Sequence, residues 1–186
     1  VYILVTILIP LVMLLVGSFM RRFGFFEIRN PYTLEHWQAV LRDSVFMSSL
    51  TNSLIIGLST AVIGMLIYSL LAYAILRGHM VGRKTLDILA WLPWSVPGIL
   101  LGMGLLWLYL GTPALRFLYG SLLGLTVAML IKGMPSGTQM MKSAILQIGL
   151  DLEESARMCG AGWLHTYFRV LLPLLAPMVV SVGVVV

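Results

Sequence analysis

Charged side chains are scarce in this sequence. Only 10% of its 186 residues are Asp, Glu, Lys or Arg, whereas a water-soluble globular domain carries about 25%. Hydrophobic residues make up 60% of the chain, and they fall in long runs. This composition excludes an ordinary soluble domain and predicts a protein that spans a membrane.

Cysteine and paired catalytic groups are also scarce. Cys159 is the single cysteine, which excludes an intrachain disulfide and a metal site built from cysteines. The three histidines, His36, His79 and His165, lie in different segments and lack the His-Glu-x-x-His spacing of zinc proteases. We therefore expect neither a metal site nor a catalytic centre in this chain.

A nucleotide-binding loop is missing as well. Residues 78–85 read Gly-His-Met-Val-Gly-Arg-Lys-Thr, but a phosphate loop needs four residues between its glycines and Lys directly after the second. We therefore expect no ATPase site and no bound cofactor. The net charge of +5 would suggest nucleic acid in a soluble protein. Here the basic residues sit in short loops facing lipid headgroups and water, so we expect no nucleic-acid partner.

The hydrophobic runs predict an all-α, polytopic helical bundle that forms a single domain over residues 1–186. A transmembrane helix needs about 20 mostly apolar residues. The runs give about five spans, at residues 1–20, 51–76, 86–110, 121–142 and 171–186. The chain starts and stops inside apolar runs and lacks an initiator Met, so we interpret it as part of a longer chain.

Short polar features between these spans predict further helix boundaries. Residues 33–41 have the pattern of a short amphipathic helix, capped by Thr33 and lying on the membrane face. Thr85 or Asp87 is expected to cap the third span.

Two predicted spans carry groups that are costly in lipid. Pro93 and Pro97 free backbone carbonyls near the middle of the third span, where each unsatisfied group costs several kcal/mol. Lys132 lies near the middle of the fourth span, ahead of Pro135, and a central Lys costs about 2.5 kcal/mol or more. Either these four residues line a hydrated path, or they are ordinary proline bends and a lysine that snorkels to the interface.

The longest polar segment between spans is residues 151–173, and its start has the features of a helix N-terminus. Asp151 is a suitable N-cap, and Glu154 stands three residues later, where it can close a capping box. Glu153 and Glu154 place negative charge at the positive end of the helix dipole.

The rest of this segment predicts a turn and a second helix. Gly160 and Gly162 are expected to supply the left-handed backbone that ends the first helix. The second helix is expected to start near Trp163 and to run until Pro173 interrupts its hydrogen bonds. An exposed helical hairpin between membrane spans indicates a contact surface for another protein.

The spacing of this segment resembles the EAA loop of ABC importer permeases. The family pattern is Glu-Ala-Ala, three residues, Gly, nine residues, then Ile-x-Leu-Pro. Two small replacements, Ser155 for Ala and Val170 for Ile, depart from it. The matching positions are Glu154, Ser155, Ala156, Gly160, Val170, Leu172 and Pro173.

The resemblance implies a MetI-like transmembrane fold in an ATP-driven importer, with residues 151–173 as its cytoplasmic coupling loop. This loop would dock on a separate ABC ATPase subunit, which binds ATP and magnesium, and would rock the spans when the ATPases close. Gly160 would set the turn, Glu154 would tie its helix to neighbouring backbone, and Ala156 would allow close approach. The residues expected to form the coupling loop are Glu153, Glu154, Ser155, Ala156, Gly160, Gly162, Trp163, Val170, Leu172 and Pro173.

The same resemblance implies partners and a location. A periplasmic binding protein would deliver the substrate, and a second permease half, fused or identical, would complete the path in the bacterial inner membrane. Residues 33–37, 147–154 and 160–164 look like the ferric-iron importer permeases, which are often two fused halves. By that likeness the chain is a C-terminal half that carries ferric iron, although polyamine, thiamine and phosphonate permeases share much of the pattern.

Two other classes of function stay open from the residues alone. An ion-gradient-driven secondary transporter or channel would use Lys132 as its coupling charge, which accounts for the buried base but not for the hairpin. A membrane scaffold that recruits a cytosolic partner would account for the hairpin without any transport.

Overall fold

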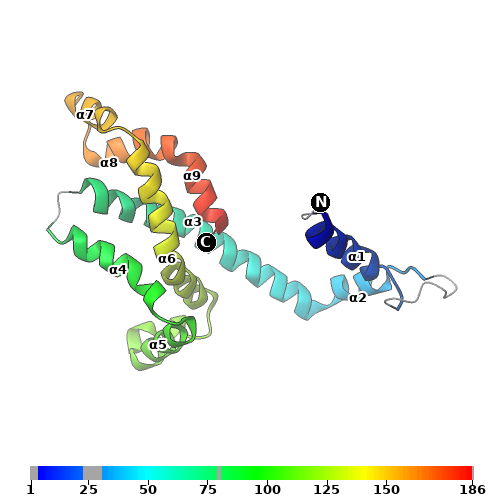
Figure 1. Cartoon of the computed structure of the whole chain (residues 1–186). Coiled ribbons are helices and arrows are strands. Elements are labelled where there is room, and N and C mark those ends of the chain that lie inside the picture. Colours follow the sequence, from blue (N-terminus) through cyan, green and yellow to red (C-terminus); the bar gives the residue numbers. More distant parts are fainter. Residues whose placement is uncertain (1–3, 23–30, 79–80, 186) are drawn as a thin grey trace. The chain divides into compact units, whose positions relative to one another are not determined.

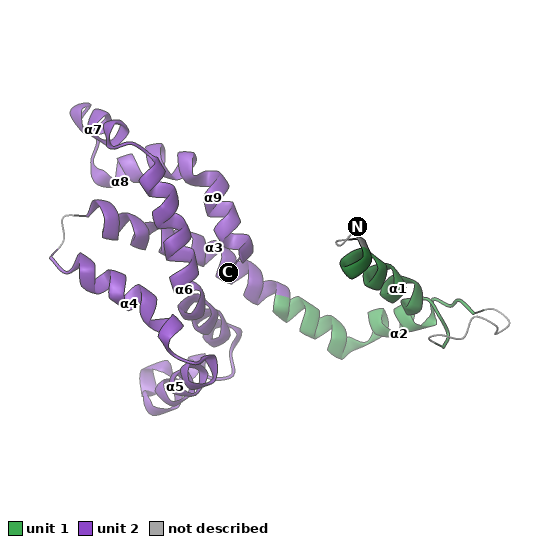
Figure 2. Cartoon of the chain, viewed as in Figure 1, with its two compact units in different colours: residues 1–53 green, residues 54–186 purple. Residues whose placement is uncertain are grey.

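The computed structural model describes residues 4–22, 31–78 and 81–185. It divides into two compact units, Val1–Ser53 and Leu54–Val186 (Figure 2). Within the described residues, strand pairing is limited to one isolated bridge between Met20 and Tyr32. The chain is therefore an all-α membrane protein, as its composition predicts.

The first unit holds the short helices η1 (Leu4–Leu8), α1 (Ile9–Ser18) and α2 (Glu35–Arg42) and the start of α3. Trp37 of α2 stacks on Phe19 at 6.0 Å between ring centroids, and its indole N–H donates to Ser18 Oγ at 3.3 Å. The backbone N–H of Glu35 donates to Thr33 Oγ1 at 3.2 Å. Thr33 therefore contributes to the start of α2 as expected, although Leu34 is the residue directly before the helix.

Helix α3 runs over Ser44–Arg77 and begins earlier than the predicted span. Asp43 Oδ1 accepts the backbone N–H of Phe46 at 2.8 Å, so Asp43 caps the helix. A helix of 34 residues is about 50 Å long, which exceeds the roughly 30 Å hydrocarbon core. The last residue of α3 is Arg77, which ends its apolar run.

The predicted span 86–110 is two helices, α4 (Arg83–Ser95) and α5 (Gly98–Gly111), bent by 110°. Pro93 is accommodated inside α4, whereas Pro97 stands directly before α5, where its missing N–H costs nothing. The break therefore falls at Val96 and Pro97.

The expectation that Thr85 or Asp87 caps this segment is wrong. Helix α4 begins at Arg83, directly after Gly82, whose φ of +103° suits glycine. Asp87 lies inside the helix instead and pairs with Lys142 of α6 at 2.7 Å.

The region from Pro113 to Gln147 contains the 3₁₀ helix η2 (Pro113–Leu118) and α6 (Leu122–Gln147). Ser121 Oγ accepts the N–H of Gly124 at 3.1 Å and so caps α6. Pro135 lies inside α6, and the Tyr68 hydroxyl of α3 donates to the carbonyl of Leu130 at 2.7 Å in the preceding turn. This bond joins α3 to α6 in the middle of both helices.

The chain ends with α7 (Leu150–Met158), α8 (Trp163–Thr166), the π turn η3 (Tyr167–Leu171) and α9 (Leu172–Val185). Helix α6 packs against α4 and α9 (Figure 1). The core of the second unit is built from α3, α6, η3 and α9, and its buried residues are Tyr68, Ala72, Tyr73, Met141, Ala144, Ile145, Tyr167, Leu171, Leu175 and Val182.

By length and apolar composition, two of the described helices could cross a membrane, α3 and the continuous helix Trp163–Val185. The bent pair α4–α5 makes a third if it is counted as one span. Helix α6 carries Lys132 and Lys142, which reduce its apolar character. The count of five spans stays a prediction.

Close packing at Gly137 gives a test of this core. A Cβ there would overlap the ring of Tyr68, which is buried and held by its hydroxyl bond to Leu130. We expect Gly137→Ala to destabilise the protein by about 1–3 kcal/mol, the usual cost of overpacking. The melting temperature of the purified protein, followed by tryptophan fluorescence, should fall.

Gly102→Ala is the matched control, because Gly102 is also helical but has nothing within 4 Å of an added Cβ. Equal melting temperatures for the two variants would contradict the packing of α3 on α6 described above.

Candidate functional site

The predicted polar hairpin consists of α7, a turn and α8, and it lies at one end of the second unit (Figure 1). The expected capping box is wrong. Helix α7 begins at Leu150, one residue before Asp151, and Gly149 precedes it without a side-chain cap bond. Its first turn still carries Asp151 and Glu153, which favour the positive end of the helix dipole.

The turn after α7 depends on Gly160. Its φ of +80° lies in the left-handed region, which confirms the expectation for this glycine. The N–H of Gly160 donates to Arg157 O at 2.8 Å and the N–H of Ala161 donates to Ala156 O at 3.0 Å. These two bonds form a Schellman motif, which satisfies the last carbonyls of α7. Gly162 has φ −68° and ψ 162°, so the left-handed expectation for it is wrong.

Pro173 does not interrupt the second helix as expected. The helix continues from Trp163 to Val185. A proline ring normally clashes with the carbonyl four residues earlier, which here belongs to Arg169. Arg169 lies inside the π turn η3, whose wider hydrogen-bonding pattern displaces that carbonyl. The π turn therefore accommodates the proline, and α8 is joined to α9 without a break.

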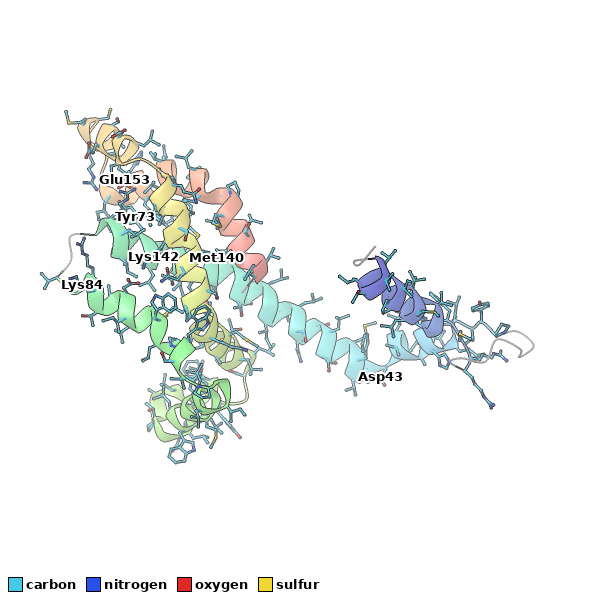
Figure 3. All side chains as sticks on the ribbon, in the orientation of Figure 1. Asp43, Tyr73, Lys84, Met140, Lys142 and Glu153 are labelled. Atoms are coloured by element: carbon cyan, nitrogen blue, oxygen red, sulfur yellow. The ribbon has the colours of Figure 1, made fainter. Side chains whose placement is uncertain are left out.

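Glu153 is the buried anchor of α7 (Figure 3). Its side chain is only 1% exposed and its Oε1 lies 3.1 Å from Arg77 Nε at the end of α3. Its Oε2 lies 3.6 Å from Arg157 Nη2 and accepts a long bond of 3.4 Å from the Tyr73 hydroxyl. Glu154 is exposed, so the buried carboxylate of α7 is Glu153, and the role expected of Glu154 stays a prediction.

Arg77 connects three helices through one guanidinium group. Its Nη2 donates to the carbonyls of Ile148 at 2.8 Å and Ile145 at 3.3 Å, where α6 ends. Its Nε–H is not aligned with Glu153 Oε1 for a hydrogen bond, so the 3.1 Å contact is an ion pair. The cation also suits the negative end of the α6 dipole. Arg77 thus joins α3, the end of α6 and α7.

Tyr167 anchors the other limb of the hairpin. Its hydroxyl lies 2.6 Å from Ser69 Oγ in a buried hydrogen bond, and its ring centroid is 5.3 Å from that of Tyr73. Ser69 and Tyr73 belong to α3, which also carries Arg77. Both limbs of the hairpin are therefore held by the same end of α3.

The exposed surface of the hairpin includes several large apolar side chains among its polar ones. Met158 is 89% exposed and Trp163 is 58% exposed, and Leu152 and Leu164 are exposed beside them. Cys159 is exposed at the turn. Leu152 and Met158 precede the candidate span Trp163–Val185, and large exposed apolar residues outside a span indicate a contact surface for a protein.

The other expected coupling residues are spread along the segment. Ser155 is exposed, and its Oγ donates to the carbonyl of Asp151 at 2.6 Å within α7. Ala156 is half-buried. Val170 and Leu172 are half-buried, and both lie beyond α8 in the helix that continues to Val185.

Of the four residues expected along a hydrated path, two line the same cavity and two do not. Pro93 and Lys132 line one cavity of about 390 Å³, together with Trp94, Gly98 and Ser136. Pro97 is exposed at the break before α5. Pro135 is buried in α6 and is not among the residues that line the cavity.

The sequence reasoning missed the partners of the charged residues. Arg77 and Lys142 each form an ion pair with an acid of another helix, Glu153 and Asp87. The available signal is that acids are rare here, so a buried acid such as Glu153 needs a base nearby.

The chain is similar in sequence to known proteins over most of its length. The family model described as "Binding-protein-dependent transport system inner membrane component" matches residues 69–186. The maltodextrin transport system permease protein MdxG of Bacillus subtilis is 28% identical over 155 residues, which cover 82% of this chain and 53% of MdxG.

Two further relatives are similar. The trehalose transport system permease protein SugB of Mycobacterium tuberculosis is 28% identical over 164 residues, covering 86% of this chain and 57% of SugB. The ferric transport system permease protein FbpB of Actinobacillus pleuropneumoniae is 26% identical over 170 residues, covering 89% and 24%. The chain thus spans little more than half the length of the first two relatives and a quarter of the third.

The anchor residue can be tested by a pair of adjacent substitutions. Glu153→Gln removes the only anion that contacts Arg77 in the described structure, and an uncompensated buried charge costs about 3–5 kcal/mol. We expect the free energy of unfolding to fall by about 3 kcal/mol, the lower value, because Arg77 keeps two carbonyl partners. The melting temperature and the resistance of the hairpin to trypsin should both fall.

Glu154→Gln makes the same chemical change at an exposed position and should leave both measurements unchanged. If both variants lowered the melting temperature and the trypsin resistance by similar amounts, the assignment of Glu153 as buried and Glu154 as exposed would be wrong.

Proposed function

Because the chain belongs to the family of binding-protein-dependent transport system inner membrane components, we propose that it forms a permease unit of an ATP-driven importer. Residues 151–173 are its coupling loop, and the contact surface includes the exposed apolar side chains of the hairpin. Its partners are ABC ATPase subunits, a second permease unit, fused or identical, and a periplasmic binding protein.

The observation that supports this proposal most directly is the double anchoring of the hairpin on α3. Glu153 holds α7 to Arg77, and Tyr167 holds the start of the last helix to Ser69. Force applied at the exposed Met158 and Trp163 therefore reaches α3 and α9 through buried contacts. Transmission of movement into membrane helices requires such stiff connections.

In this proposal, ATP is hydrolysed by the ABC ATPase subunit and not by this chain. The ATPase subunit binds ATP and magnesium, and this chain contributes neither ligands nor a general base. Glu154 and Ser155 are exposed on α7 and face the ATPase, while the small Ala156 permits close approach to its surface. Gly160 fixes the angle between the two limbs through its left-handed backbone.

We place the translocation path along the cavity that contains Pro93 and Lys132. The break between α4 and α5 leaves the first N–H groups of α5 without helical carbonyl partners or a side-chain cap, and lipid cannot satisfy them. A water-filled path beside the break satisfies them and also hydrates the Lys132 ammonium group. Pro135 lies in α6 directly before Ser136, which lines the cavity, and its missing N–H removes one helix hydrogen bond there.

For the cargo, we propose ferric iron, as implied by the likeness of residues 147–154 and 160–164 to ferric-iron permeases. The relative FbpB is named for ferric transport, while MdxG and SugB are named for maltodextrin and trehalose. Uptake of radioactive iron by the complete transporter, compared with sugars and oxyanions, separates these cargoes. Uptake of a sugar instead of iron would overturn the cargo and leave the permease role intact.

Substitution of Gly160 tests the coupling role. A β-branched residue at φ +80° is strained, and a left-handed backbone costs roughly 1–2 kcal/mol for an ordinary residue. We expect Gly160→Val to abolish most uptake by proteoliposomes while ATP hydrolysis by the assembled complex continues. Parallel assays of uptake and phosphate release measure the two activities.

Gly149→Val is the control, since Gly149 borders the same hairpin at φ −59° and an added Cβ meets nothing closer than 3.9 Å. Full uptake by the Gly160 variant would show that the turn at Gly160 is not needed to couple ATP hydrolysis to transport. Uptake that survives without ATP but collapses with an ion gradient would favour the secondary-transporter alternative.

Filling the cavity tests the path. Ser136 lines the cavity beside Lys132, so Ser136→Trp should obstruct it and lower uptake at least tenfold without releasing the ATPase subunit. Ser143→Trp places the same side chain on an exposed part of α6 and should retain uptake. Copurification of the ATPase checks assembly in both variants, and normal uptake by Ser136→Trp would move the path elsewhere.

A further inference from the structure

A second cavity is lined by the end of α3 and by the hairpin. It has a volume of about 560 Å³ and is lined by Leu70, Tyr73, Ala74, Arg77, Arg157 and Trp163. Most of its wall is apolar side chain from α3, and its polar groups are two guanidinium groups and a phenol. We call it the arginine groove.

The charges at the groove do not balance. Arg77 and Arg157 both contact Glu153, at 3.1 and 3.6 Å, so two cations share one buried anion. The side chain of Arg157 is 48% exposed, and its contact with Glu153 is a long one. Among the described residues, Arg157 forms an ion pair with Glu153 alone. The groove therefore favours a ligand with a negatively charged group.

The position of the groove identifies the source of that ligand. Arg77 is the last residue of the candidate span Ser44–Arg77, and Trp163 is the first residue of the candidate span Trp163–Val185. The end of the first candidate span and the start of the second therefore lie together, because the two residues line one cavity. Tryptophan and arginine at the ends of spans are typical of the headgroup level of a bilayer.

We infer that the arginine groove binds one anionic phospholipid, with its phosphate at Arg157 and Arg77 and an acyl chain along Leu70 and Ala74. Basic pockets between membrane helices bind anionic headgroups by this combination of charge and apolar wall. The lipid would fill the space between α3 and the hairpin. This inference concerns lipid binding alone and stands or falls independently of transport.

The test measures lipid binding by the whole purified permease, without its ATPase, in detergent with added phosphatidylglycerol or phosphatidylcholine. Native mass spectrometry counts the lipids that stay bound. Wild type should retain phosphatidylglycerol in preference to phosphatidylcholine. Arg157→Gln should weaken phosphatidylglycerol binding about fivefold, since a basic residue near an anionic lipid contributes about 1 kcal/mol.

Two further variants separate charge from shape. Arg169→Gln removes an exposed cation of the same segment that does not line the groove, and it should bind lipid as wild type does. Ala74→Phe fills the apolar wall with both arginines intact and should release the bound lipid. The melting temperature of each variant verifies that it is folded.

Three results would overturn the inference. Equal retention of the two lipids by wild type would remove the anionic preference. Equal effects of Arg157→Gln and Arg169→Gln would show that general surface charge, not the groove, attracts lipid. Loss of the bound phosphatidylglycerol when the ATPase subunit is added would assign the groove to that protein.

Discussion

The buried contact between Arg77 and Glu153 is the constraint on which the second unit depends. A carboxylate that is 1% exposed and a guanidinium that is 11% exposed stabilise each other where water is largely excluded. Because Arg77 also binds the last carbonyls of α6, the pair fixes the end of one helix, the end of another and the start of the hairpin. Ser69 of α3 is hydrogen-bonded to Tyr167 near the start of the last helix, and Tyr73 of α3 donates to Glu153 of α7. Stiffness at the hairpin comes from a few polar groups instead of a large apolar core.

Prolines shape the remainder of the unit, and three of them show different ways in which a helical protein accommodates the residue. Pro97 precedes α5 and coincides with a break, Pro135 stays inside an unbroken α6, and Pro173 follows a π turn. A membrane helix tolerates proline only where neighbouring groups satisfy or displace the affected carbonyls. The same residue type therefore produces a bend in one helix and continuity in another, according to the packing around it.

The sequence was sufficient for the elements that depend on local chemistry. Long apolar runs predicted the helices, and the EAA spacing predicted the turn at Gly160, because only glycine readily adopts its backbone. Glu153 and Glu154 are adjacent and chemically alike, so their different burial depends on which face of α7 meets α3. That choice, like the pairing of Asp87 with Lys142, joins residues far apart in the chain and has no local signature. Pro93 and Pro97 likewise predicted an interruption of the third span, but the angle of 110° between α4 and α5 has no signature in the sequence.

The contact of Arg77 with Glu153 also restricts the path of the backbone through the bilayer. Two charged groups 3.1 Å apart lie on one side of the membrane, so the chain between them crosses an even number of times. Among the described residues of that stretch, α6 and the bent pair α4–α5 are the segments long enough to cross, alone or together. If α6 crosses the bilayer, an even number of crossings requires the bent pair to cross it as well, as a broken span. If α6 does not cross, the bent pair does not cross either, so the topology of the bent pair follows from that of α6.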